Sequence, residues 1–457
     1  MRFTVTLPLL CTIALLAACS KKDDTPPPLT GPVTQQEINN WILDSMRVFY
    51  LWNRQLPEKP DHSLETQAFF SSIRNAEDKY SIVYNPDDAS SAGGTDLLYK
   101  YGLDFSIISW PQAAGSVMGV VQIVIPGSGA EQAGFKRGDY FTRINGTLLT
   151  SANAVQLSEE MKKAGSSRLT KASINGGTIT EDMTITLQGG SVNENPMYLS
   201  TVFDAGTKKA GYIFYNAFVD RYDRNVLAAF NDFKRAGISD LVMDIRYNSG
   251  GSLAAAAMIT VITAPGTTAS GPYVRYTGND NQGTRMLDFS TTLAYPESGG
   301  PIRFADLVPS QLMLPRVYIL TGRRTISAAE LLINNLKPYT QVIQIGAVTA
   351  GKDKGAVIIE DTHTPRRIPW VIVPLTYRLA NANGEGNYDK GITPQYLVDE
   401  MGSLPLLPIG DPKDPLIAKA LALIGGNGRA GTESRQQVTR VYEAGSNKML
   451  IIPNVKR

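Results

Sequence analysis

Between about residue 195 and residue 425, β-type and helical segments alternate along the chain. The apolar runs AGYIFYNAF and DLVMDIRY are typical of buried strands, and the amphipathic segment RNVLAAFNDFKRAG between them is typical of a helix. This alternation predicts a layered α/β domain, which we assign to residues 193–425. Because 457 residues exceed what one ordinary core holds, we expect further domains.

Two blocks of different character precede this region. Residues 34–92 carry a helical pattern, with Ile38, Trp41 and Ile42 recurring at three- and four-residue steps, and predict a small helical subdomain. Residues 93–192 consist of short β-type runs separated by glycine-containing turns, and predict a β-rich domain. The expected fold is therefore a multidomain protein of the α+β and α/β classes. The tail, residues 426–457, could hold a last strand pair, and its place is not predicted.

The first residues have the pattern of an export signal. Residues 1–18 hold one basic residue, an apolar run and a small-residue end, which predicts a signal peptide. The LAAC segment ending at Cys19 resembles the lipobox of bacterial lipoproteins. That resemblance implies lipidation of Cys19 and export to the cell envelope, with the outer membrane as the expected anchor. The polar, proline-rich composition that follows predicts an extended tether over 19–33. A plain secretory signal is the alternative.

Composition narrows the possible chemistry. The net charge is +2, and no basic excess points to a nucleic-acid partner. If Cys11 leaves with the signal and Cys19 carries lipid, no thiol remains for catalysis, disulfides or metal binding. The chain also has no HExxH motif, so we expect no metal site and no cofactor.

Three segments of the α/β region could carry chemistry together. In DIRYNSGGSL, Gly250 and Gly251 could let amide N–H groups approach an oxyanion. In TISAAE, Ser327 stands between a strand and a helix start, where either a nucleophile or an ordinary N-cap serine is found. In GAVTAGKDKGA, Lys352 follows about twenty-five residues later.

The order and spacing of these segments resemble the C-terminal processing (tail-specific) serine peptidases, in their bacterial lipoprotein form. The resemblance implies a layered α/β serine peptidase core with Ser327 as nucleophile and Lys352 as general base. It also implies an oxyanion hole formed by the amide of Ala328 and one glycine amide, Gly250 or Gly251, with Gly250 preferred.

Residues 93–192 resemble a PDZ domain, which stands before the peptidase core in that family. The segment YGLDFSI matches the loop and strand that bind a peptide's C-terminal carboxylate, which implies that role for Tyr101, Gly102, Leu103, Asp104 and Phe105. A PDZ-like fold without a peptide groove is the alternative.

A lysine base makes a physical demand on its surroundings. Free lysine has a pKa near ~10.4, whereas a general base at neutral pH needs about 7–8. We therefore expect Lys352 to be desolvated among apolar strands, with Lys354 as its solvated neighbour. Some family members orient this lysine with a glutamine four positions later, but Ala356 stands there. The group that orients Lys352 is left open.

Other groups are alternatives with weaker support. His363, expected at a hairpin tip, is an alternative base, and His62 is expected on the surface. Glu330, in the first helical turn after Ser327, is expected to act on the helix dipole or to be structural. Asp244 and Arg246 are expected to shape the Gly-Gly turn.

These features together predict an envelope serine endopeptidase with a Ser-Lys dyad. Its PDZ domain would capture the C-termini of protein or peptide substrates. The alternative is a catalytically silent lipoprotein that binds peptides through the same groove. A glycan-binding or glycan-degrading lipoprotein lacks support, because no paired carboxylates stand out on an aromatic segment.

Overall fold

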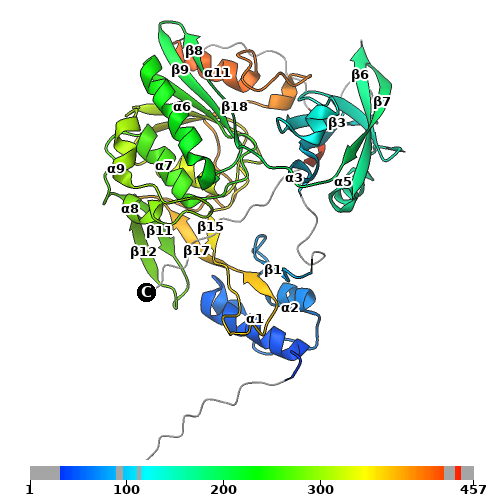
Figure 1. The fold of residues 1–457 in the computed structure, drawn as a ribbon, viewed down its shortest axis with the longest axis vertical. Coiled ribbons are helices and arrows are strands. Elements are labelled where there is room, and N and C mark those ends of the chain that lie inside the picture. The colour runs from blue at the N-terminus through cyan, green and yellow to red at the C-terminus, as the bar shows by residue number, and fades with distance from the viewer. Residues whose placement is uncertain (1–30, 89–95, 111–114, 176, 427–437, 444–457) are drawn as a thin grey trace, which may run out of the picture.

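The computed structural model describes residues 31–88, 96–110, 115–175, 177–426 and 438–443, arranged as three bodies (Figure 1). The expected signal peptide, Cys19 and nearly all of the tether lie outside these ranges. Within the described ranges, no helix is both long and apolar enough to cross a membrane.

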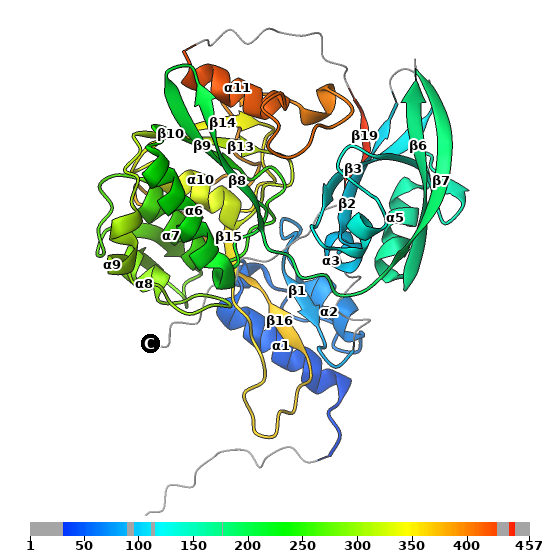
Figure 2. The same cartoon turned by 45° about the horizontal axis from the view of Figure 1, so that its top comes forward.

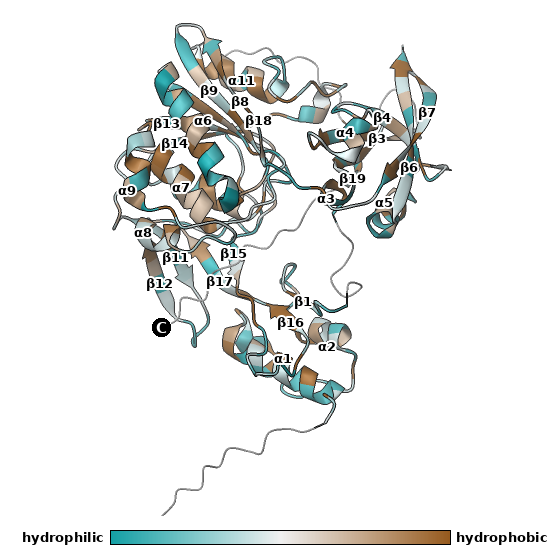
Figure 3. Ribbon diagram, in the orientation of Figure 1, coloured by the Kyte–Doolittle hydropathy of each residue, from teal (hydrophilic) through white to brown (hydrophobic). Residues whose placement is uncertain are grey.

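The N-terminal body is helical and contains a strand from far along the chain. Thr34 begins its first helix through a reciprocal capping box with Glu37. Its elements are α1 Gln35–Phe49, the 3₁₀ turn Asn53–Gln55, α2 Thr66–Ile73 and β1 Ile82–Tyr84. β1 pairs antiparallel with β16 Val371–Val373, whose hydrophobic residues (brown in Figure 3) complete the small core. The helical pattern predicted the helices, but not this strand from the α/β region.

The β-rich body holds one sheet in the order β19-β2-β3-β4-β6-β7, with β5 paired to β4. Its elements are α3 Leu97–Tyr101, β2 Leu103–Ser109, β3 Val117–Val124, α4 Gly129–Gln132, β4 Tyr140–Ile144, β5 Thr147–Leu148, α5 Ala154–Lys163, β6 Ser166–Asn175 and β7 Thr178–Gln188. The edge strand β19 Arg440–Glu443 comes from the C-terminal tail, and Figure 2 shows it beside β2. The described part of the tail, residues 438–443, thus joins this sheet.

The largest body is the layered α/β domain that the strand-helix alternation predicted. Its main sheet has the order β18-β14-β13-β10-β9-β8, with all neighbours parallel except β8 and β9. The bounds are β8 Met197–Ala205, β9 Lys208–Tyr215, α6 Asp223–Ala236, β10 Asp240–Asp244, α7 Leu253–Thr263, β13 Arg316–Thr321, α10 Ala328–Leu336, β14 Gln341–Gly346, β18 Tyr396–Leu397 and α11 Pro415–Ile424. Helices α6, α7 and α10 pack in one hydrophobic cluster and α11 in another, so both faces of the sheet are covered.

A second sheet, in the order β12-β11-β17-β15, lies beside α7 and α10 and extends toward the N-terminal body (Figure 1). Its elements and neighbours are β11 Pro272–Thr277, β12 Thr284–Asp288, α8 Phe289–Leu293, α9 Phe304–Leu307, β15 Lys354–Ala356 and β17 Leu375–Ala380. Because β16 and β17 are almost continuous, they join the N-terminal body to the α/β domain. The mixed α/β multidomain fold expected from the sequence is confirmed.

Candidate active site

Ser327 stands on a strained turn between β13 and α10. Its backbone has φ +66° and ψ −119°, a left-handed conformation that non-glycine residues adopt at a cost of about 1–3 kcal/mol. The side chain is buried, and its Oγ has no hydrogen-bond partner among the described residues. A buried hydroxyl without a partner is unfavourable in a purely structural role. The geometry matches a strand-to-helix turn that presents a nucleophile.

The Gly-Gly turn packs directly against this serine. β10 and β13 are parallel neighbours, so the loops that follow them meet at the same edge of the sheet. The Ile326 N–H donates to Asn248 O at 3.1 Å. Gly250 has φ +88°, and a Cβ placed on it would lie 2.8 Å from Ser327 Cβ. Glycine is therefore required here both for its conformation and for this close approach.

The candidate oxyanion donors differ in whether their backbone N–H groups already have a hydrogen-bond acceptor. The Gly250 N–H donates to Asn248 Oδ1 at 2.8 Å, so the amide that the sequence favoured already has an acceptor. For the N–H groups of Gly251 and Ala328, no acceptor is found in the described part of the chain. The pair Ala328 and Gly251 is therefore the more available one in this structure.

Lys352 is buried in the loop that follows β14, with 2% of its surface exposed. Burial lowers the pKa of Lys352 to about 8, against the opposing negative charges of Glu330, Glu297 and Asp78. Lys352 is therefore desolvated, as expected for a lysine that acts as a general base. Its Nζ lies 5.0 Å from the centroid of the Tyr80 ring, which belongs to the N-terminal body.

Glu330 ties the serine turn to the lysine loop. Its Oε2 accepts from the backbone N–H groups of Ser327, at 3.0 Å, and Lys352, at 2.8 Å. Its Oε1 accepts from Gly351 N–H at 2.6 Å and Thr349 Oγ1 at 2.5 Å. Burial raises the pKa of Glu330, and these four donors oppose that shift. Four donors around one carboxyl group hold both loops in a fixed relation.

Sequence reasoning undervalued Glu330 and missed Tyr80. The Ser-x-x-Glu spacing signalled a contact within the helix start, but not the reach of Glu330 to the lysine loop. No pattern pointed to Tyr80, because it lies on another domain. Ala356, which stands where an orienting glutamine would be, is fully buried in β15. The ring of Tyr80 makes a cation-π contact with Lys352.

Two expectations about side-chain exposure, those for Lys354 and His62, need correction. Lys354 is not solvated: its side chain is 12% exposed and its Nζ donates to Asp353 Oδ1 at 2.5 Å. His62 is half-buried, with its ring centroid 5.2 Å from that of Phe69. His363 has an 80% exposed side chain and pairs with Asp361, so it lies outside the buried serine-lysine region.

Asp244 and Arg246 form a buried ion-pair cluster where the chain leaves β10. Arg246 Nη2 lies 2.7 Å from Asp244 Oδ2, and its Nη1 lies 2.9 Å from Asp414 Oδ2 at the start of α11. All three side chains are buried. The ion pairs therefore tie the end of β10 to the start of α11.

A cleft of about 700 Å³ runs beside both catalytic candidate loops. It is lined by the end of β14, by the residues before Lys352, by Arg323 before the serine turn, and by Arg440 of β19. Its position at the carboxyl edge of the parallel strands is where α/β sheets bind ligands. Among the described residues, no cluster of His, Cys, Asp and Glu could hold a metal ion.

The five residues expected to bind a carboxylate lie together at the start of β2. Gly102 has φ +81°, and the side chains of Tyr101, Leu103, Asp104 and Phe105 are buried. Asp104 pairs with Arg324, which stands three residues before Ser327. The start of β2 is thus connected to the loop that carries the serine.

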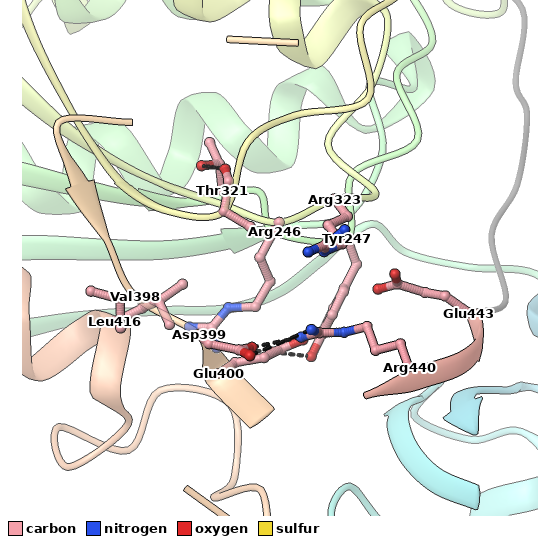
Figure 4. Close-up of a pocket in the computed structure, with 12 residues that line it drawn as sticks. Arg246, Tyr247, Thr321, Arg323, Val398, Asp399, Glu400, Leu416, Arg440 and Glu443 are labelled. Carbon is pink, nitrogen blue, oxygen red and sulfur yellow. Dashed lines mark hydrogen bonds and ion pairs between the residues drawn. The ribbon is translucent and has the colours of Figure 1, made fainter. Parts of the chain in front are cut away.

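The β-rich body and the α/β domain share a buried polar interface, part of which is drawn in Figure 4. Arg137 of the β-rich body donates to Tyr247 Oη at 2.5 Å and to Glu400 Oε2 at 3.4 Å. Tyr247 and Glu400 line a small pocket together with Arg440 and Glu443 of β19.

Two family models match parts of the chain. The model of peptidase family S41 matches residues 209–398, and that of the peptidase S41 N-terminal domain matches residues 37–82. A chloroplastic C-terminal processing peptidase of Tetradesmus obliquus is 26% identical over 242 residues, covering 51% of this chain and 47% of the relative. A carboxyl-terminal-processing protease of Picosynechococcus is 27% identical over 234 residues, covering 51% of this chain and 50% of the relative. The chain thus spans about half the length of these relatives.

Solved structures share the fold over most of the chain. The crystal structure of a candidate S41 protease from Bacteroides fragilis has 25% identity and a TM-score of 0.67, covering 88% of this chain and 100% of that one. The photosystem II D1 C-terminal processing protease, at 17% identity and a TM-score of 0.50 over 87% of this chain and 98% of that one, supports the fold alone. Residues 209–398 thus carry a peptidase family S41 domain, residues 37–82 carry a peptidase S41 N-terminal domain, and the relatives that the chain resembles are C-terminal processing peptidases.

Proposed function

We propose that the chain is a serine endopeptidase in which Ser327 is the nucleophile and Lys352 is the general base. The observation that carries this proposal is the pairing of two unusual groups. A buried hydroxyl without a partner stands on a strained turn, and a buried lysine has a pKa lowered to about 8. Glu330 connects the backbones of the two residues through one carboxyl group.

The chemistry follows from these groups. Neutral Lys352 takes the proton from Ser327 Oγ, while Oγ attacks the carbonyl carbon of the peptide bond. The amides of Ala328 and Gly251 stabilise the negative oxygen of the tetrahedral intermediate. Protonated Lys352 then gives its proton to the leaving nitrogen, the C–N bond breaks, and an acyl-enzyme forms. A water molecule deprotonated by Lys352 releases the acyl group and restores the serine.

We also propose that the β-rich body is a PDZ domain whose β2 edge takes substrate C-termini. The left-handed Gly102 just before β2, and the pairing of β2 with the separate short strand β19, support this role. The lipobox-like segment ending at Cys19 supports an anchored envelope location.

The test uses the chain from residue 31 to 457, which contains every described residue. It is incubated with a denatured protein substrate and with a fluorophosphonate probe, and both products are identified by mass spectrometry. Ser327→Ala and Lys352→Ala should each lose at least about 10³-fold in activity, as expected when a nucleophile or its base is removed. The probe should modify the peptide that contains Ser327.

Ser290→Ala and Lys337→Ala, both exposed, are matched controls that should retain full activity. If Ser327→Ala cleaves as fast as the unmodified protein, or if the probe modifies another residue, the dyad assignment is wrong. If no form cleaves while peptides with free carboxylates still bind, the silent peptide-binding protein is the better description.

A further inference from the structure

The ligand edge of the β-rich body is already occupied by the chain itself. β19 pairs antiparallel with β2, placing Arg440 opposite Ile108 and Glu443 opposite Ser106. The Ser109 N–H also donates to Thr439 O at 2.9 Å. β19 thus runs along β2 toward the loop at Tyr101–Phe105, and it contacts α5 on its other side. An added peptide strand would need this same edge and the same direction.

Apolar side chains seat the strand in the groove. Val441 and Tyr442 pack against the hydrophobic cluster of the β-rich body, and the Tyr442 ring centroid lies 5.9 Å from that of Phe105. Val438 is buried in the cluster that contains Trp110. Backbone pairing and alternate side chains in pockets are the two components of peptide recognition by strand addition.

Charged side chains fasten the same strand to the α/β domain. Arg440 Nη2 lies 2.6 Å from Asp399 Oδ1, just after β18. Glu443 lies near Arg324 and Arg440, and burial raises the pKa of its carboxyl group against these positive charges. Figure 4 shows Arg440 and Glu443 on β19 facing the α/β domain. The strand therefore contacts both the groove and the domain that carries Ser327.

We propose that residues 438–443 are the resident ligand of the β2 edge, and that a substrate C-terminus binds there only by displacing them. This inference rests on the proposed capture of C-termini and extends it to a competition. The edge of one strand accepts one partner strand. A ligand joined by a short linker competes at an effective concentration of the order of mM, so it weakens binding of a free peptide.

The displacement would be sensed near the serine. Arg324 pairs with Asp104 on β2 and interacts with the charge of Glu443, and it stands three residues before Ser327. Exchange of β19 for another peptide removes Glu443 from this arginine. The self-occupied state and the substrate-bound state therefore differ in charge beside the loop that carries the nucleophile.

The experiment measures peptide binding in a Ser327→Ala background, so that cleavage plays no part. The probe is a fluorescein-labelled peptide with the sequence of residues 434–443, SRQQVTRVYE, and a free carboxylate. A chain shortened to residues 31–426 lacks the strand. A chain ending at residue 443 keeps it and is the matched control. Fluorescence anisotropy gives Kd, and hydrogen exchange reports the amides of residues 106–109.

A locked variant tests the opposite state. Ser106→Cys with Glu443→Cys places two thiols on directly opposed strand positions, at a spacing that suits a disulfide. The chain from residue 31 has no other cysteine. Oxidation should abolish probe binding, and reduction should restore it. Ser106→Cys alone controls for loss of the Ser106 hydroxyl and should not respond to oxidation.

The shortened chain should bind the probe at least about tenfold more tightly than the full chain and the chain ending at 443, and its residues 106–109 should exchange faster. Equal Kd values in all forms, no binding by any form, or full binding by the oxidised variant would overturn the proposal. Exchange that is unchanged by removal of the strand would also overturn it. None of these readouts depends on catalysis, so failure of the dyad assignment would be seen separately.

Discussion

Replacing Lys352 by methionine should abolish activity and stabilise the fold. The side chain is 2% exposed, and its pKa is lowered from 10.5 to about 8, so the folded state disfavours the charged form. At roughly 1.36 kcal/mol per pKa unit, this shift corresponds to about 3 kcal/mol. Methionine has a similar volume without the charge, so Lys352→Met removes that cost.

The pH dependence identifies the origin of the effect. Between pH 8 and pH 10.5 the unfolded chain keeps a proton on Lys352 that the folded chain has released, so stability rises with pH over this range. The destabilising effect of Lys352 is therefore absent above pH 10.5, grows as the pH falls, and is complete below about pH 8. The difference in free energy of unfolding between Lys352→Met and the parent should therefore be about 2 kcal/mol larger at pH 7 than at pH 9.5, in favour of the variant.

Urea unfolding of the α/β domain at both pH values measures this difference, in a Ser327→Ala background that prevents self-cleavage. The exposed Lys337→Met is the matched control and should change stability by less than about 0.5 kcal/mol at either pH. A Lys352→Met variant that is less stable than the parent, or whose advantage is independent of pH, would refute the argument that burial of the charged lysine lowers its pKa.

Three further predictions follow from the same site. The value of kcat/KM should rise with pH and level off above about 8, because the neutral form of Lys352 is the base; a flat profile between pH 6 and 9 would exclude it. Gly250→Ala should reduce activity by more than about tenfold, because its Cβ would lie 2.8 Å from Ser327 Cβ, whereas Gly134→Ala, with φ +84° and open space, should lose only stability. Glu330→Gln should destabilise the domain by about 1–3 kcal/mol, because the NH₂ group of the new side chain would face backbone N–H donors. The same substitution removes a negative charge near Lys352 and should therefore lower the apparent pKa of activity. An unchanged pH profile would contradict this prediction.

The sequence was sufficient for the features that depend on local pattern. Alternating apolar strands and amphipathic helices predicted the α/β domain, because each element must bury its own apolar face against a neighbour. The spacing of Ser327 and Lys352, together with the Gly-Gly turn, identified the family that the comparisons confirm. Burial of Lys352 could be expected as well, because the runs on both sides of it are apolar.

Tertiary structure alone decided which distant groups meet. Glu330 reaches the lysine loop, and Tyr80 reaches Lys352, only because the sheet edge and the N-terminal body come together there. Lys354 donates a hydrogen bond to Asp353, a contact that its sequence neighbours did not predict. The Gly250 N–H donates to Asn248, which leaves the Gly251 amide as the more available oxyanion donor. The pairing of β19 with β2 had no signal in the pattern of either segment. A short strand can join any open edge, and which edge it joins is set by contacts between residues far apart in the chain.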